Sequence, residues 1–222
     1  KATQYTPEEI KRILKDMDSV KRRGSDTLYW EDVEIGEKLG PVVVPPWTLQ
    51  DLNAPETVSK GVLHIPLGEA GDEFAFEPAY HRMKTKKEGH PVTHPITRWP
   101  WTPPAEHSDP ILAAYRALPG PFDGGVQRTQ IPYQLLTNWM GDDGFVRRMQ
   151  TAIRKPVFYA DTTYYTGEVV KKFKEVQQGE SGPGAKPGKV EYNAVGIKYQ
   201  GLNQVEEAQV IGTATVYLPS RE

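Results

Sequence analysis

Residues 120–144 read GPFDGGVQRTQIPYQLLTNWMGDDG, an apolar stretch enclosed by two glycine-containing turns. This spacing of large side chains predicts a helix over Val126–Met140, because one of its faces is then densely apolar. Pro132 lies inside the span and is expected to kink the helix or to shift its start. The apolar residues concerned are Ile131, Leu135, Leu136, Trp139 and Met140.

After residue 144 the apolar period changes from helical to alternating, which predicts strands. A hairpin loop without core residues is expected at 177–188, which read QQGESGPGAKPG. Helices combined with an antiparallel sheet in this way make an α+β domain. Four strands are expected here, one marked by Val146, Met149, Ile153 and Val157, and the others over Thr162–Lys172, Val190–Tyr199 and Ala208–Leu218.

The part before residue 120 predicts an N-terminal helix within residues 1–27. Thr6 and Glu9 can form a capping box, Pro7 suits the first helical position, and Gly24 is expected to end the helix after a basic last turn. We interpret it as a docking or oligomer-clasping element. A strand is then expected over Val42–Trp47, followed by a short polar turn at Thr48–Asp51.

Residues 53–106 hold many Pro, Gly and His residues and show no sustained period. Long stretches of this kind tend to be functional, so we expect an excursion that covers one end of the domain. Because the chain also lacks an internal repeat, we predict a single domain over residues 1–222.

The composition narrows the possible partners and compartments. A formal net charge of −2 with mixed signs predicts no nucleic-acid or membrane partner, and no apolar run approaches the ~18 residues that span a bilayer. The absence of Cys excludes disulfides and thiolate chemistry and fits a reducing cytoplasm. His90 and His94 are four residues apart, but Pro91 and Pro95 argue against a helical metal site, so we expect no metal.

Several segments together resemble the MaoC-type acyl dehydratases, a hot-dog family, mostly over residues 28–50 and 107–220. The resemblance implies a single hot-dog domain in which the sheet wraps around the helix of residues 125–140. It implies an enoyl-CoA hydratase or dehydratase, with acyl-CoA as the substrate and no other cofactor. The matching segments are LYWEDVEIGE (28–37), GPFDGGVQR (120–128), LTNWMGDDG (136–144), IRKPVF (153–158), DT (161–162), GEV (167–169), NQ (203–204) and GTATVYLPS (212–220).

Hydration of an enoyl thioester needs a base for the water and a donor for the charge on the thioester oxygen. The resemblance implies that His107 is the base. Thr102, however, stands where the family has an Asp. The candidates for the missing carboxylate are Glu106, Asp109 and Asp123, and each has an alternative role as a solvent-facing acid or a helix cap, which suits Asp109 before Pro110.

Gly124 and Gly125 precede the predicted helix, whose first amides are free to donate. The resemblance implies an oxyanion donor near Gly125, and a tight turn alone would explain both glycines equally well.

Three further side chains are candidates for substrate binding. Trp101 and Phe122 can wall an acyl pocket or simply pack, and Arg128 can pair with Asp123 or with a substrate phosphate.

Two alternatives to a complete hydratase remain open. The chain can be a catalytically incomplete subunit of a heteromeric MaoC-type hydratase, or a hot-dog thioesterase, because the fold alone does not decide the chemistry. A single small sheet leaves an edge exposed, so we expect at least a homodimer.

Overall fold

The computed structural model describes residues 3–56, 92–98, 100–101, 105–178 and 188–221. Their contacts divide into two compact units. One unit holds the sheet and comprises residues 6–45, 128–155 and 163–222; the second comprises residues 1–5, 46–127 and 156–162. The single domain expected over residues 1–222 stays a prediction.

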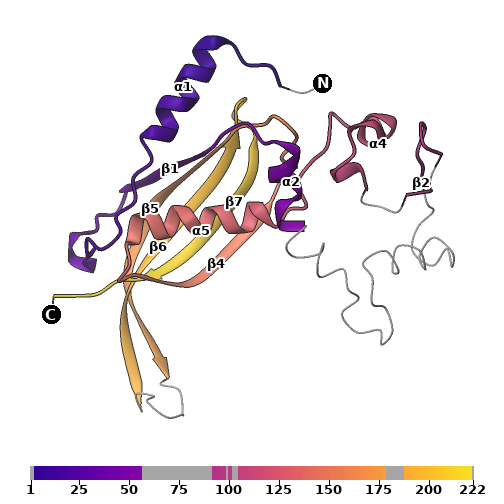
Figure 1. Ribbon diagram of the computed structural model, residues 1–222. Coiled ribbons are helices and arrows are strands. Elements are labelled where there is room, and N and C mark those ends of the chain that lie inside the picture. Colours follow the sequence, from indigo (N-terminus) through magenta and orange to yellow (C-terminus); the bar gives the residue numbers. More distant parts are fainter. Residues whose placement is uncertain (1–2, 57–91, 99, 102–104, 179–187, 222) are drawn as a thin grey trace. The chain divides into compact units, whose positions relative to one another are not determined.

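The first unit, which we call the sheet unit, contains five antiparallel strands in the order β1-β5-β6-β7-β4. Figure 1 shows α5 (Gln127–Met140) lying along one face of this sheet. The arrangement confirms the predicted α+β class and the hot-dog pattern of a sheet around one helix. The strands are β1 (Lys38–Val44), β4 (Phe145–Ile153), β5 (Thr163–Gln178), β6 (Lys189–Asn203) and β7 (Ala208–Tyr217).

The core of the sheet unit lies between α5 and the sheet. Leu135 and Leu136 of α5 are 1% and 0% exposed. Side chains alternate between the two faces of a strand, so every second residue of a strand can face the helix. In β6, Val195, Ile197 and Tyr199 are buried, whereas Lys198 between them is exposed. The alternating pattern in the sequence therefore arises from burial of one sheet face.

The predicted N-terminal helix is α1 (Pro7–Asp18), with the expected capping box between Thr6 and Glu9. These hydrogen bonds lower the pKa of the Glu9 carboxyl. The expected end at Gly24 is wrong, because the helix closes at Ser19, whose N–H returns to carbonyls of the last turn. Ile13 is the buried residue of α1, and the Tyr164 hydroxyl lies 3.1 Å from Oδ2 of Asp16.

Other boundaries differ from the prediction for local reasons. The strand expected at 42–47 begins at Lys38 and ends at Val44. The strand expected to reach Val157 ends at Ile153. Pro132 neither shifts the start of α5 nor divides it, since the helix runs from Gln127 through Pro132 to Met140.

The second unit holds the helices α2 (Leu49–Glu56), η3 (Ala105–His107) and α4 (Pro110–Tyr115), and the two-residue strands β2 (Val92–Thr93) and β3 (Pro100–Trp101). The polar turn predicted at Thr48–Asp51 is instead the start of α2. The Thr48 hydroxyl accepts the N–H of Asp51, and Asp51 accepts the N–H of Thr48, which is a capping box.

Much of the predicted excursion lies outside the described residues. None of the helices that the structure describes is both long and apolar enough to cross a membrane.

Candidate functional site

His107 ends η3 in the second unit and is half-buried. Its Nδ1 lies 2.9 Å from the carbonyl oxygen of Phe122, and the two rings are 3.9 Å apart. A carbonyl oxygen only accepts hydrogen bonds, so Nδ1 carries the proton in the neutral ring. Nε2 then holds the lone pair. The backbone of Phe122 thus fixes the tautomer that a general base requires.

Asp109 acts as the N-cap of α4. Its Oδ1 accepts the N–H groups of Ile111 and Leu112 at 2.8 and 3.2 Å. Its Oδ2 lies 3.2 Å from Nε2 of His94. The described hydrogen bonds of Asp109 therefore fit the capping role. The imidazole that its carboxylate contacts is that of His94.

His94 is 3% exposed and is held at both ring nitrogens. Its Nδ1 accepts the N–H groups of Ile96 and Thr97, at 3.2 and 2.9 Å. Because Nδ1 is an acceptor, the proton of the neutral ring resides on Nε2 and is directed to Asp109. This closes a polar link between the turn at residues 94–97 and the start of α4.

Asp123 is 1% exposed and accepts backbone N–H groups with both oxygens. Oδ2 lies 3.1 Å from the nitrogen of Gly125, and Oδ1 lies 3.0 Å from the nitrogen of Val157. Gly125 adopts a φ of +85°, a backbone conformation that favours glycine. Gly125 is buried, and the preceding Gly124 is exposed. The Gly125 amide is therefore engaged by Asp123 and is not a free donor in this structure.

The candidate substrate-binding residues lie in different parts of the chain. Phe122 packs on His107 and lies 5.9 Å from the ring of Phe158. In the sheet unit, Arg128 is buried and donates to the carbonyl oxygen of Lys155. Trp101 contributes its backbone to β3, but its side chain lies outside the described residues.

Two buried residues of the second unit were not singled out from the sequence. Trp47 and Gln127 are 3% and 4% exposed. The Gln127 side-chain nitrogen donates to the carbonyls of Asp51 and Leu52 at 3.2 and 2.9 Å. The spacing Thr48–Asp51 is the sequence signal that could have revealed α2, and with it the anchor of Gln127.

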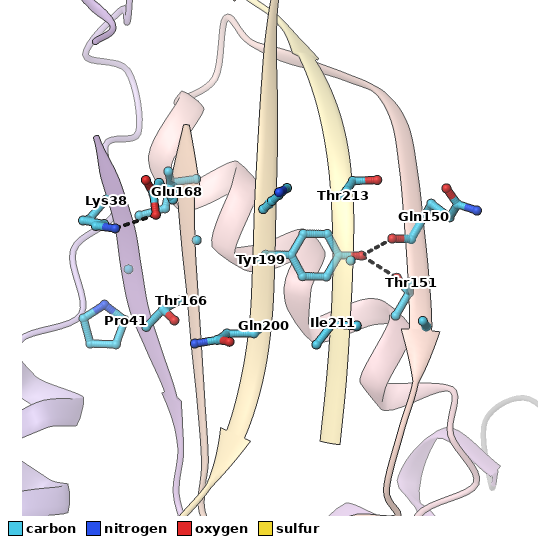
Figure 2. Close-up of a pocket in the computed structure, with 16 residues that line it drawn as sticks. Lys38, Pro41, Gln150, Thr151, Thr166, Glu168, Tyr199, Gln200, Ile211 and Thr213 are labelled. Atoms are coloured by element: carbon cyan, nitrogen blue, oxygen red, sulfur yellow. Dashed lines mark hydrogen bonds and ion pairs between the residues drawn. The ribbon is translucent and has the colours of Figure 1, made fainter. Parts of the chain in front are cut away.

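A groove of about 860 Å³ lies on the sheet unit, and Figure 2 shows its lining. Lys38 and Glu168 form an ion pair of 2.5 Å at one side, and the Tyr199 hydroxyl lies 3.0 Å from the carbonyl oxygen of Gln150 at the other. Burial raises the pKa of the Tyr199 hydroxyl. The lining contains no histidine and none of the residues that the sequence predicts for the site.

Within the part of the chain that the structure describes, no three His, Asp or Glu side chains cluster in a way that could hold a metal ion.

Comparison with solved structures relates the fold to known hydratases. The (R)-hydratase PhaJ1 from Pseudomonas aeruginosa superposes with a TM-score of 0.55 at 15% identity, over 88% of either chain. An (R)-hydratase from A. caviae involved in PHA biosynthesis gives 0.51 at 17% identity, over 85% of this chain and 99% of that one. A MaoC-like dehydratase gives 0.53 at 14% identity, over 89% of this chain and 44% of the other.

No protein-family model and no curated protein matches the sequence. The structural likeness nevertheless shows that the chain has the hot-dog fold of the MaoC-like dehydratases and (R)-hydratases.

Proposed function

We propose that the chain adds water to, or removes it from, the 2,3 double bond of an enoyl thioester, with acyl-CoA as the substrate. The fold supports this reaction, since solved structures named (R)-hydratase and MaoC-like dehydratase share it. A fold can host several chemistries, so the specific claim depends on the residues of the site.

The observation that carries the proposal is the hydrogen bond from Nδ1 of His107 to the carbonyl of Phe122. It leaves the lone pair on Nε2, which can take a proton from water as the oxygen attacks carbon 3. The electron pair of the double bond then moves towards the thioester oxygen. The imidazolium returns the proton to carbon 2, so that one water is added and the ring is restored.

Negative charge on the thioester oxygen needs a donor, and Gly125 remains the candidate for this role. Its N–H donates to Asp123 in the free chain. To stabilise the substrate, this N–H must therefore donate to the thioester oxygen, either in place of the Asp123 carboxylate or shared between the two acceptors.

A second candidate function, a catalytically incomplete subunit, is favoured by one observation. The described hydrogen bonds of Asp109 and Asp123 go to backbone groups and to His94, and Thr102 replaces the acid that the resemblance implies. In that case a partner chain of the same family would supply the carboxylate.

The test is His107→Ala, assayed by the loss of the enoyl-thioester absorbance of crotonyl-CoA. A general base contributes ~10²–10⁴-fold, so turnover should fall by at least ~100-fold while the circular dichroism spectrum is unchanged. Tyr115→Ala is the matched control, because Tyr115 is 64% exposed on the neighbouring helix α4.

Unchanged turnover of His107→Ala would remove His107 from the mechanism. Release of free thiol from acyl-CoA would identify a thioesterase instead. Hydration that appears only when a second, co-purified chain is present would establish the incomplete subunit.

A further inference from the structure

A polar cavity of about 500 Å³ lies within the sheet unit, between the segment that follows α1, strand β1 and the second half of α5. Its volume is in the range of ~300–1,000 Å³ that is typical of small-molecule sites. Lys21, Arg22 and Arg23 line it as three consecutive cations. They do not form a basic last turn of the helix, because α1 ends at Asp18, so they belong to the segment after it.

The segment of residues 21–26 is fixed to the C-terminal end of α5 by hydrogen bonds of the backbone. The N–H of Arg23 donates to the carbonyl of Asn138 at 2.9 Å, and the N–H of Asp142 donates to the carbonyl of Gly24 at 2.8 Å. The backbone that carries the three cations is therefore in place before a ligand binds, which lowers the entropic cost of binding.

The guanidinium of Arg23 is anchored at one atom. Its Nε donates to the carbonyl of Trp139 at 2.8 Å, one of the carbonyls that the end of a helix leaves without a helical partner. The described hydrogen bonds of Arg23 involve this Nε and the backbone N–H. The two Nη groups therefore remain available to a ligand, and guanidinium groups pair well with phosphate oxygens.

The other two cations are exposed. Within the described part of the chain, no hydrogen bond or ion pair engages the side chain of Lys21 or of Arg22. Lys38 also lines the cavity, but its ammonium pairs with Glu168 at 2.5 Å. Lys21 and Arg22 can therefore bind an anion without first giving up an ion pair.

The charges of the lining favour an anion over a cation. Asp26 and Glu37 are the acids that line the cavity, and Oε1 of Glu37 accepts the indole N–H of Trp139 at 2.7 Å. Apart from the ion-paired lysine, three cations face these two acids, which leaves one net positive charge. A phosphate group carries about −1.5 to −2 charge at pH 7 and three acceptor oxygens, so it can use the several N–H donors of two guanidinium groups and an ammonium.

We propose that this cavity binds the phosphate groups of a small molecule, with Lys21, Arg22 and Arg23 as the binding residues. The proposal does not depend on the hydratase reaction, since His107 and Gly125 are not among the residues that line the cavity. Two kinds of ligand carry such groups: the CoA of the proposed substrate and a separate phosphorylated metabolite. Both present the same chemistry to the cavity, and competition between them separates the two sources.

The test is calorimetric titration of the full chain with inorganic pyrophosphate at low ionic strength, where exposed charges are little screened. The wild-type chain should bind one pyrophosphate. The double variant Lys21→Ala/Arg22→Ala should bind it at least ~10-fold more weakly, because hydrogen bonds from two charged donors are removed.

The matched control is Lys11→Ala/Lys15→Ala. Both lysines are exposed on α1 and do not line the cavity, so this variant loses the same charge at a different place. Its Kd for pyrophosphate should be nearly that of the wild-type chain. In a second measurement on the wild-type chain, pyrophosphate should protect Lys21 from acetylation, read by mass spectrometry, and should leave Lys15 as reactive as before.

The outcomes are distinct. No binding of pyrophosphate, an equal loss of affinity in the two double variants, or unchanged acetylation of Lys21 overturns the site. When pyrophosphate binds as expected, its displacement by free CoA assigns the cavity to the phosphates of CoA. Failure of CoA to displace it assigns the cavity to a separate phosphorylated ligand.

Discussion

The substitution Asp123→Asn distinguishes a structural from a catalytic role for this buried acid. Asp123 is 1% exposed, and its two oxygens accept the N–H groups of Gly125 and Val157 at 3.1 and 3.0 Å. Its own N–H donates to the carbonyl of Val157 at 3.0 Å. The side chain therefore ties the turn before α5 to the segment at residues 156–162.

Asparagine has nearly the same shape but replaces one acceptor oxygen by an NH₂ group. In either orientation this group faces a backbone N–H, so a donor meets a donor. One charge-assisted hydrogen bond is lost, at ~1.5–3 kcal/mol, and one buried N–H is left unpaired, at ~1–3 kcal/mol. Since the two costs overlap, we expect the free energy of unfolding to fall by ~2–5 kcal/mol.

The assay is urea unfolding followed by circular dichroism. With a slope of ~2 kcal/mol per molar, the urea midpoint should fall by ~1–2.5 M. Asp142→Asn is the control, because Asp142 is exposed and should leave the midpoint unchanged. Loss of turnover at an unchanged midpoint would refute the structural role and place Asp123 in the chemistry.

Two further predictions concern the sheet unit. A Cβ at Gly212 would lie 2.2 Å from Cζ of Tyr199 and 2.4 Å from the carbonyl oxygen of Gln150. Gly212→Ala should therefore lower the free energy of unfolding by ~1–3 kcal/mol or more, measured by thermal or urea unfolding. Gly120→Ala, whose nearest contact would be 3.9 Å away, is the control and should have a small effect, and equal stability of the two variants would contradict the packing argument. Strand β4 lies at one edge of the sheet, so sedimentation velocity should show at least a dimer, and a stable monomer would contradict the expectation.

The strands could be predicted because the sheet buries one face. The buried apolar residues Val195, Ile197 and Tyr199 of β6, and Val210, Ala214 and Val216 of β7, are two or four positions apart, and this even spacing is visible in the sequence. The lengths were less predictable. β5 continues to Gln178, six residues beyond its predicted end at Lys172, where it still pairs with β6. Four of these six residues are polar, and the two apolar ones, Phe173 and Val176, do not alternate, so this part carries no period-two signal.

The helices could be predicted where local hydrogen bonds mark their starts. The capping box of α1 involves residues three apart, so it could be predicted, and the same pattern at Thr48–Asp51 was misinterpreted as a turn. The apolar signal of α2 is weak: Leu52 is buried in it, and Leu49 is exposed. Its start is therefore marked by polar hydrogen bonds rather than by a hydrophobic face.

Two partners of the candidate acids could not be predicted from the sequence, because they lie far along the chain. Asp109 contacts His94, 15 residues earlier, and Asp123 accepts an N–H from Val157, 34 residues later. The cap at Asp109 was a stated alternative, since a residue before proline is a typical N-cap. Long-range pairing of this kind depends on the tertiary fold, which local residue patterns do not encode.

The partner of His107 has a consequence for the chemistry. A carboxylate on Nδ1 would both select the tautomer and stabilise the positive charge that the ring gains when it takes a proton. The carbonyl of Phe122 selects the same tautomer, but it is a dipole and compensates the charge less. In the proposed mechanism the backbone controls the tautomer of the ring, and among the described residues the partner of Nδ1 is this carbonyl and not a carboxylate. In the incomplete-subunit proposal a second chain brings the compensating carboxylate, so the two proposals differ in the source of one negative charge.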